Sequence, residues 1–141
     1  MDSDKMESNN QRLQDKYRKM EEEECRYEAI MCDDAEYIFV AYGTSSRVCQ
    51  KSVEIAREKG LKVGLLRPIT LFPFPSKIIG KLACKAKGFL SVEMSAGQMI
   101  EDIKLSVYDA GCIARVEHFG RMGGIIPSPG EVVNALEQKF L

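Results

Sequence analysis

The 141-residue sequence contains one histidine, no tryptophan and five scattered cysteines. No serine–histidine–aspartate triad can be recognised around the single histidine. One histidine also cannot form a metal site that is built on paired histidines. No CxxC pair or Cys/His cluster occurs, which argues against a zinc site or an iron–sulfur cluster held by this chain alone. The cysteines are therefore expected to be reduced, partly buried thiols.

Long apolar runs and an excess of one charge are also missing. No run approaches the roughly 20 residues that span a bilayer, and the start MDSDKMESNNQRLQ lacks the apolar segment of a secretory signal. We therefore expect a cytoplasmic protein with no membrane contact. The formal net charge of −1 argues against a partner nucleic acid bound through bulk positive charge.

Charge is nevertheless unevenly distributed along the chain. Residues 1–36 carry 12 acidic and 6 basic residues, a net charge of −6, whereas residues 37–141 carry 14 basic and 9 acidic residues, a net charge of +5. From Gln11 to Tyr27 the sequence predicts a polar helix whose apolar stripe (Leu13, Tyr17, Met20) is too thin to hold it to a core. We expect residues 1–34 to be an acidic helical arm or linker to further polypeptide, followed by a single domain over residues 35–141.

After Asp34, apolar β-rich runs alternate with helical patterns. Strands are predicted at 37–42, 62–66, 89–93 and 113–117, and helices at 44–59, 76–87, 98–108 and 130–140. Such alternation predicts an α/β fold: a three-layer, mostly parallel, doubly wound sheet with helices on both faces. The last strand alternates in polarity and is expected near an edge. Ligands of such sheets bind beyond the carboxyl ends of the strands, where loops begin at Gly43, Arg67, Met94 and His118.

The first of these loops has two readings. The segment Gly43-Thr44-Ser45-Ser46-Arg47 joins a glycine and hydroxyl groups to a helix start, which is typical of an anion site. It lacks both the GxGxxG and the GxxxxGK[ST] signatures, so ordinary helix capping by its hydroxyl groups is the favoured reading.

Charged side chains stand at the ends of the other strands. Arg67 is placed to pair with a carboxylate, either Glu93 at the end of the next strand or one on another polypeptide. His118 has the chemistry of a general acid or base, but a hydrogen-bonded interface histidine is the favoured reading. The predicted interface comprises Arg67, Phe72, Phe74, Glu93, Met94, His118, Phe119 and Arg121, since aromatic and methionine side chains are enriched at interfaces.

Four stretches together carry a family resemblance: VAYGTSSR at 40–47, KVGLLRPITLFPFP at 62–75, VEMSAGQM at 92–99 and GRMGGIIP at 120–127. They resemble the C-terminal domain of the alpha subunit of 2-oxoacid:ferredoxin oxidoreductases, of the 2-oxoisovalerate and 2-oxoglutarate branches. The resemblance covers residues 11–141 and implies a fold like the last domain of transketolases. It also implies complexes that oxidatively decarboxylate a 2-oxoacid to an acyl-CoA and pass electrons to ferredoxin.

The resemblance implies thiamine diphosphate, magnesium, iron–sulfur clusters and CoA for the complete complex, and none of them on this chain. The implied partners are a thiamine-type N-terminal domain and beta- and gamma-type subunits. The Gly-Asp-Gly and Asn-Asn pattern that holds magnesium diphosphate in the family is missing, so the isolated chain is expected to be inactive. The main alternative is a free-standing, flavodoxin-like module that binds a small anion, and a regulatory or scaffold role is the third.

Overall fold

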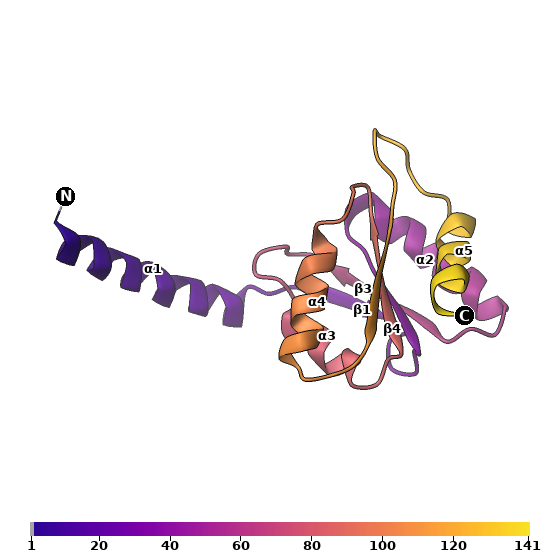
Figure 1. Cartoon of the computed structure of the whole chain (residues 1–141), viewed down its shortest axis with the longest axis horizontal. Coiled ribbons are helices and arrows are strands. Elements are labelled where there is room, and N and C mark those ends of the chain that lie inside the picture. Colours follow the sequence, from indigo (N-terminus) through magenta and orange to yellow (C-terminus); the bar gives the residue numbers. More distant parts are fainter. Residues whose placement is uncertain (1) are drawn as a thin grey trace.

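The computed structural model describes residues 2–141 and is built around a five-stranded sheet (Figure 1). The elements follow one another as α1 (Ser3–Glu23), β1 (Tyr27–Ile30), β2 (Tyr37–Val40), α2 (Gly43–Glu58), β3 (Val63–Pro68), α3 (Ser76–Ala83), β4 (Gly88–Glu93), α4 (Met99–Asp109), β5 (Arg115–Gly120) and α5 (Pro129–Phe140). The strand order is β1-β3-β2-β4-β5. Strands β2 to β5 pair in parallel, and β1 pairs antiparallel with β3.

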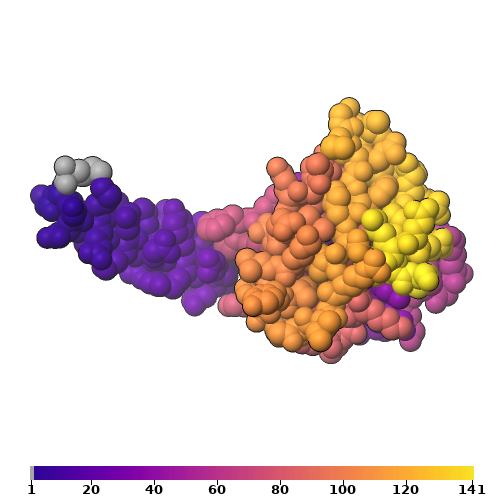
Figure 2. Space-filling view, viewed as in Figure 1, coloured from indigo at the N-terminus to yellow at the C-terminus, as the bar shows by residue number. Residues whose placement is uncertain are grey.

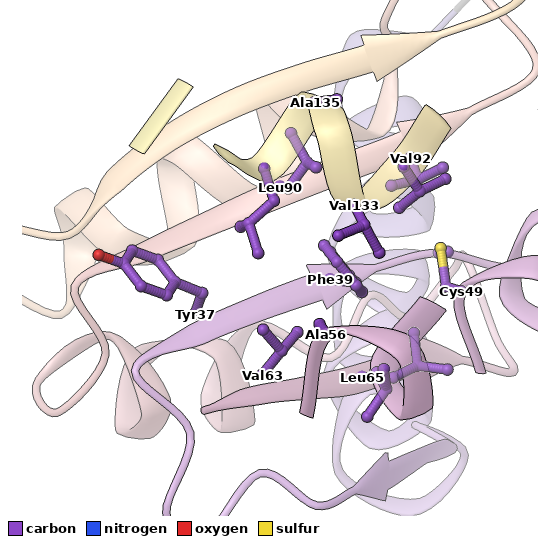
Figure 3. Packing of buried hydrophobic residues seen from close by; sticks show 14 residues of the cluster. Tyr37, Phe39, Cys49, Ala56, Val63, Leu65, Leu90, Val92, Val133 and Ala135 are labelled. Atoms are coloured by element: carbon purple, nitrogen blue, oxygen red, sulfur yellow. The ribbon is translucent and has the colours of Figure 1, made fainter. Parts of the chain in front are cut away.

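Two separate cores confirm the three-layer, doubly wound architecture. On one face of the sheet, Phe39 packs with residues of α2 and α5, such as Cys49 and Val133 (Figure 3). On the other face, Ile38 and Val40 pack with residues of α3 and α4. Because successive strand residues point to opposite faces, a strand covered on both sides must be apolar at every position, as the YIFV sequence of β2 is.

The strand order reverses direction between β2 and β4. From β2 the chain passes through α2 to β3 on one side, and from β3 it passes through α3 to β4 on the other side of β2. Helices leaving neighbouring strands in opposite directions open a crevice above their carboxyl ends. This crevice is where a doubly wound sheet offers a binding site. The expected edge position of the last strand is also confirmed, since β4 is the one strand of residues 2–141 that pairs with β5.

The N-terminal helix projects away from the sheet (Figures 1 and 2). Helix α1 has no buried residue, as its thin apolar stripe predicts, although it covers Ser3–Glu23 rather than the expected residues 11–27. The structure differs from the expected arm in a second respect. Tyr27–Ile30, within the predicted arm, forms β1 and joins the sheet. A four-residue strand gives little periodicity in the sequence, so only pairing with β3 reveals it.

The expectation of five reduced thiols is corrected at one pair. Cys84, at the end of α3, and Cys112, just after α4, are joined as a disulfide, and their Cα atoms lie 5.3 Å apart. Cys25, Cys32 and Cys49 are free thiols. The pairing depends on how α3 packs against α4, which residue spacing along the chain does not reveal.

Candidate functional site

A buried carboxylate organises the carboxyl edge of the sheet. Glu93 is the last residue of β4, and its side chain is 1% exposed. Its two oxygens accept five hydrogen bonds within 3.2 Å. The donors are the hydroxyl groups of Ser91 and Ser95 and the backbone N–H groups of Gln98, Met99 and Ile100.

These hydrogen bonds make Glu93 the anchor of α4. Gln98, Met99 and Ile100 begin the helix, whose first N–H groups have no acceptor within the helix itself. A carboxylate at this end satisfies them and interacts favourably with the helix dipole. Burial raises the pKa of Glu93, but the hydrogen bonds from Ser91, the α4 N–H groups and Ser95 outweigh burial, so the net pKa lies below its ordinary value.

His118 lies beside this carboxylate. Its Nδ1 is 3.5 Å from Glu93 Oε1, is buried, and has no hydrogen-bond partner within residues 2–141. The ring packs against Gly120, where an added Cβ would come within 2.5 Å of His118 Nε2 and 2.2 Å of the Ser95 carbonyl oxygen. A side chain at position 120 would therefore clash with these atoms, and only glycine fits there. The hydrogen-bonding and catalytic roles weighed for His118 stay predictions.

The crevice between β2 and β4 holds a small cavity of about 120 Å³. It is lined by Tyr42, Gly43, Thr44, Ser45, Glu93 and Met94. The expected hydroxyl capping of α2 is wrong: Tyr42 is the N-cap residue without a side-chain hydrogen bond, and the Ser46 hydroxyl donates to the Gly43 carbonyl. Ligand pockets for cofactor-sized molecules measure roughly 300–1,000 Å³. The cavity is therefore too small for a flavin or a nucleotide.

Within the chain, Arg67 pairs with Glu28 and not with the expected Glu93. Its Nη1 lies 2.9 Å from Glu28 Oε2, the residue opposite it in the β1–β3 pairing. Both side chains are more than two-fifths exposed, so the pair adds little stability. The sequence did not predict β1, and it therefore did not place Glu28 opposite Arg67.

The residues predicted for the interface separate into exposed, partly buried and buried groups, and Glu93 is the buried one. Phe72 is 59% and Met94 is 41% exposed. Phe74, between β3 and α3, and Phe119, within β5, are instead partly buried and packed against the cores. Arg121 forms an ion pair with Glu131. Arg47, the fifth residue of α2, is exposed.

Other exposed apolar side chains in these loops were not singled out from the sequence. We call the set along the carboxyl edge the apolar rim. It consists of Tyr42, Ile69, Leu71, Phe72, Met94, Met122, Ile125 and Ile126. The signal available in the sequence was the unusual number of large apolar residues in segments between elements, such as Ile125-Ile126 after two glycines.

No trio of histidine, cysteine or carboxylate side chains in residues 2–141 is arranged to hold a metal ion. Within the same residues, no helix combines the length and apolar character needed to cross a bilayer. What this edge offers is a firmly anchored set of loops with exposed apolar tips.

Comparison with known proteins places this architecture in a family. Residues 35–132 match the family described as pyruvate:ferredoxin oxidoreductase core domain II. The chain is similar to ketoisovalerate oxidoreductase subunit VorB of Methanothermobacter thermautotrophicus, with 50% identity over 98% of this chain and 38% of that protein. It is also similar to 2-oxoglutarate synthase subunit KorA of Methanocaldococcus jannaschii, with 36% identity over 89% of this chain and 32% of that protein. The chain thus spans about a third of the length of these relatives.

Solved structures share the fold. A 2-oxoglutarate:ferredoxin oxidoreductase from Magnetococcus marinus matches with a TM-score of 0.69 and 19% identity, over 80% of this chain and 19% of that one. A split-gene transketolase matches with a TM-score of 0.65 and 12% identity, over 80% of this chain and 40% of that one. The match to core domain II covers most of the chain, and the expected transketolase-like fold is confirmed. The chain therefore belongs to the pyruvate:ferredoxin oxidoreductase core domain II family.

Proposed function

We propose that the chain is the domain II component of a 2-oxoacid:ferredoxin oxidoreductase and that it supplies a docking surface to the complex. The observation that carries this proposal is the apolar rim. Its eight side chains come from the loops after β2, β3, β4 and β5, which follow the carboxyl ends of the parallel strands. Exposed apolar side chains concentrated in one region mark interaction sites.

The rim is attached to a rigid base, which favours docking. Glu93 fixes the loop that carries Met94 by accepting four hydrogen bonds, from the Ser95 hydroxyl and from the N–H groups of residues 98–100. Two prolines, Pro73 and Pro75, stiffen the loop that carries Leu71 and Phe72. Loops that are already ordered lose little conformational entropy on association. A preformed apolar edge is therefore suited to a permanent interface between domains or subunits.

The proposed partner is the polypeptide that makes up the rest of the relatives' length, together with the other subunits of the complex. The chain aligns with only 38% of VorB from M. thermautotrophicus, so the larger part of such a protein lies outside it. We expect ketoisovalerate rather than 2-oxoglutarate as the 2-oxoacid, because identity to the VorB proteins is 50–56% and identity to the KorA proteins is 33–36%.

The proposed complex oxidatively decarboxylates the 2-oxoacid to an acyl-CoA and transfers electrons to ferredoxin. Thiamine diphosphate, magnesium and iron–sulfur clusters are assigned to its other parts. Residues 2–141 contain no group of histidine, cysteine and carboxylate side chains arranged to hold a metal ion, and the crevice cavity of about 120 Å³ is smaller than the pockets of cofactor-sized molecules. No reaction step is assigned to this chain.

Copurification tests the proposal. The chain would be expressed with the remaining oxidoreductase polypeptides of the same organism, and we expect a stable complex on size exclusion. Phe72→Glu and Ile126→Glu place charge in the rim and should weaken association at least tenfold. Ile113→Glu is the matched control, because Ile113 is fully exposed but precedes β5 at the opposite edge. Absence of a complex with the unmodified chain, or equal losses with all three variants, would contradict the proposal.

A further inference from the structure

The end of α3 and the segment after α4 are held at a fixed spacing by packing. An added Cβ on Gly80 would lie 3.0 Å from the Ala110 Cβ, so the missing side chain lets the two helices approach closely. Cys84 is the C-cap residue of α3, and Cys112 follows Ala110, the C-cap residue of α4, by two positions. Their Cα separation of 5.3 Å lies within the range of roughly 4.4–6.8 Å that a disulfide requires.

The surroundings of this pair differ from those of the other cysteines. Cys84 is exposed and Cys112 is half-buried, so reagents in solution can reach the bridge. By contrast, burial raises the pKa of Cys32 to about 11 and also raises that of Cys49, which keeps both as unreactive thiols.

We propose that Cys84 and Cys112 form a reversible thiol–disulfide pair that exchanges with low-molecular-weight thiols and disulfides. In closing, one cysteine thiolate attacks the small disulfide and releases one small thiol, forming a mixed disulfide. The second cysteine thiolate then attacks this mixed disulfide and releases the second small thiol. The two cysteines lose two electrons and two protons, and the small disulfide gains them. Opening is the reverse reaction with a small thiol.

The bridge ties the end of α3 to the entry of β5. Cys112 lies three residues before β5, the edge strand next to β4. Strand β5 leads directly into the rim loop with Met122, Ile125 and Ile126. A covalent link at its start restricts the unfolded chain over a sequence separation of 28 residues. Closing the pair should therefore stabilise the domain without changing its fold.

Thiol counting on the full chain tests the proposal. The protein would be equilibrated with oxidised or reduced glutathione, quenched with acid, unfolded and alkylated, and analysed by intact mass and peptide mapping. We expect three alkylated cysteines and a Cys84–Cys112 link after oxidised glutathione, and five alkylated cysteines after reduced glutathione. Cys84→Ser and Cys112→Ser should abolish the link, whereas the control Cys25→Ser should retain it.

The unfolding midpoint provides a second measurement that does not depend on the mass analysis. Oxidised protein should unfold roughly 5–15 °C above reduced protein, and this difference should vanish in Cys84→Ser. Five reactive thiols after oxidised glutathione, or a link that involves Cys25, Cys32 or Cys49, would overturn the assignment. A link that survives reduced glutathione in the folded protein would overturn its reversibility.

Discussion

His118 Nδ1 lies 3.5 Å from the Oε1 atom of Glu93, a carboxylate that already accepts five hydrogen bonds. The contact joins β5 to β4 at the point where both strands reach the carboxyl edge. Through Glu93 the same point also fixes the start of α4 and the loop that carries Met94. One buried side chain thus organises three of the segments that surround the crevice, and its loss should affect all of them.

Replacing Glu93 by glutamine should destabilise the fold by about 2–4 kcal/mol. The amide has one oxygen where the carboxylate has two, and its NH₂ group faces donors, so buried N–H groups of α4 lose their acceptor. Urea unfolding at neutral pH measures the effect. Glu117→Gln is the control, because Glu117 forms only partly exposed ion pairs with Arg115 and Lys139 and should change stability by less than about 1 kcal/mol. Equal effects of the two substitutions would refute the anchoring role.

The contribution of Glu93 should depend on pH with a defined sign. Its pKa in the folded state lies below the ordinary value of 4.5, because its hydrogen bonds outweigh burial. As the pH falls below 4.5, Glu93 takes up a proton more readily in the unfolded chain than in the folded chain. The stabilisation by its carboxylate is therefore complete at neutral pH and declines as the pH falls towards the folded-state pKa. The stability difference between the unmodified chain and Glu93→Gln should therefore shrink between pH 6 and pH 3. A difference that stays constant would contradict this linkage.

Gly120→Ala should be strongly destabilising, by about 2–4 kcal/mol. The new Cβ would lie 2.2 Å from the Ser95 carbonyl oxygen, which is backbone and cannot rotate away. Gly130→Ala is the matched control: Gly130 lies in the first turn of α5, and nothing within 4 Å would meet its Cβ. Alanine there should be neutral or stabilising by up to about 1 kcal/mol, because it is the better helix former. Thermal or urea unfolding of both variants measures the contrast.

Helix α1 should be dispensable for the stability of the domain. It buries no residue, and its aromatic contact with the domain is an edge-on approach of Tyr17 to Phe72, with ring centroids 5.9 Å apart. Trypsin should cleave first at Arg12, Lys16, Arg18 or Lys19, leaving a fragment that unfolds within about 1 kcal/mol of the intact chain. Cleavage at Lys51 or Arg57 in α2 at the same rate would show that α1 is not the weakest element.

Much of the fold could be predicted because local patterns carry it. The fully apolar YIFV segment requires a strand covered on both faces, and Gly60, with φ +83°, ends α2 where the sequence predicts a stop. The site was predicted less well. Glu93 was recognised as a strand-end carboxylate, but its donors include N–H groups from residues 98–100, and backbone groups leave no signature in side-chain identity.

Taken alone, the sequence determined the order of the four parallel strands and of the helices that follow them, the exposed N-terminal helix and the family. The order of elements follows from the periodicity of apolar residues, and the exposure of α1 follows from an apolar stripe too narrow to hold it to the core. The family follows from short motifs, each contiguous along the chain. Only the tertiary structure decided which distant groups meet: Arg67 with Glu28 through β1, Glu93 with α4 and His118, and Cys84 with Cys112. Such pairings depend on how the elements pack in three dimensions. The spacing of residues along the chain does not reveal which distant side chains will lie close together.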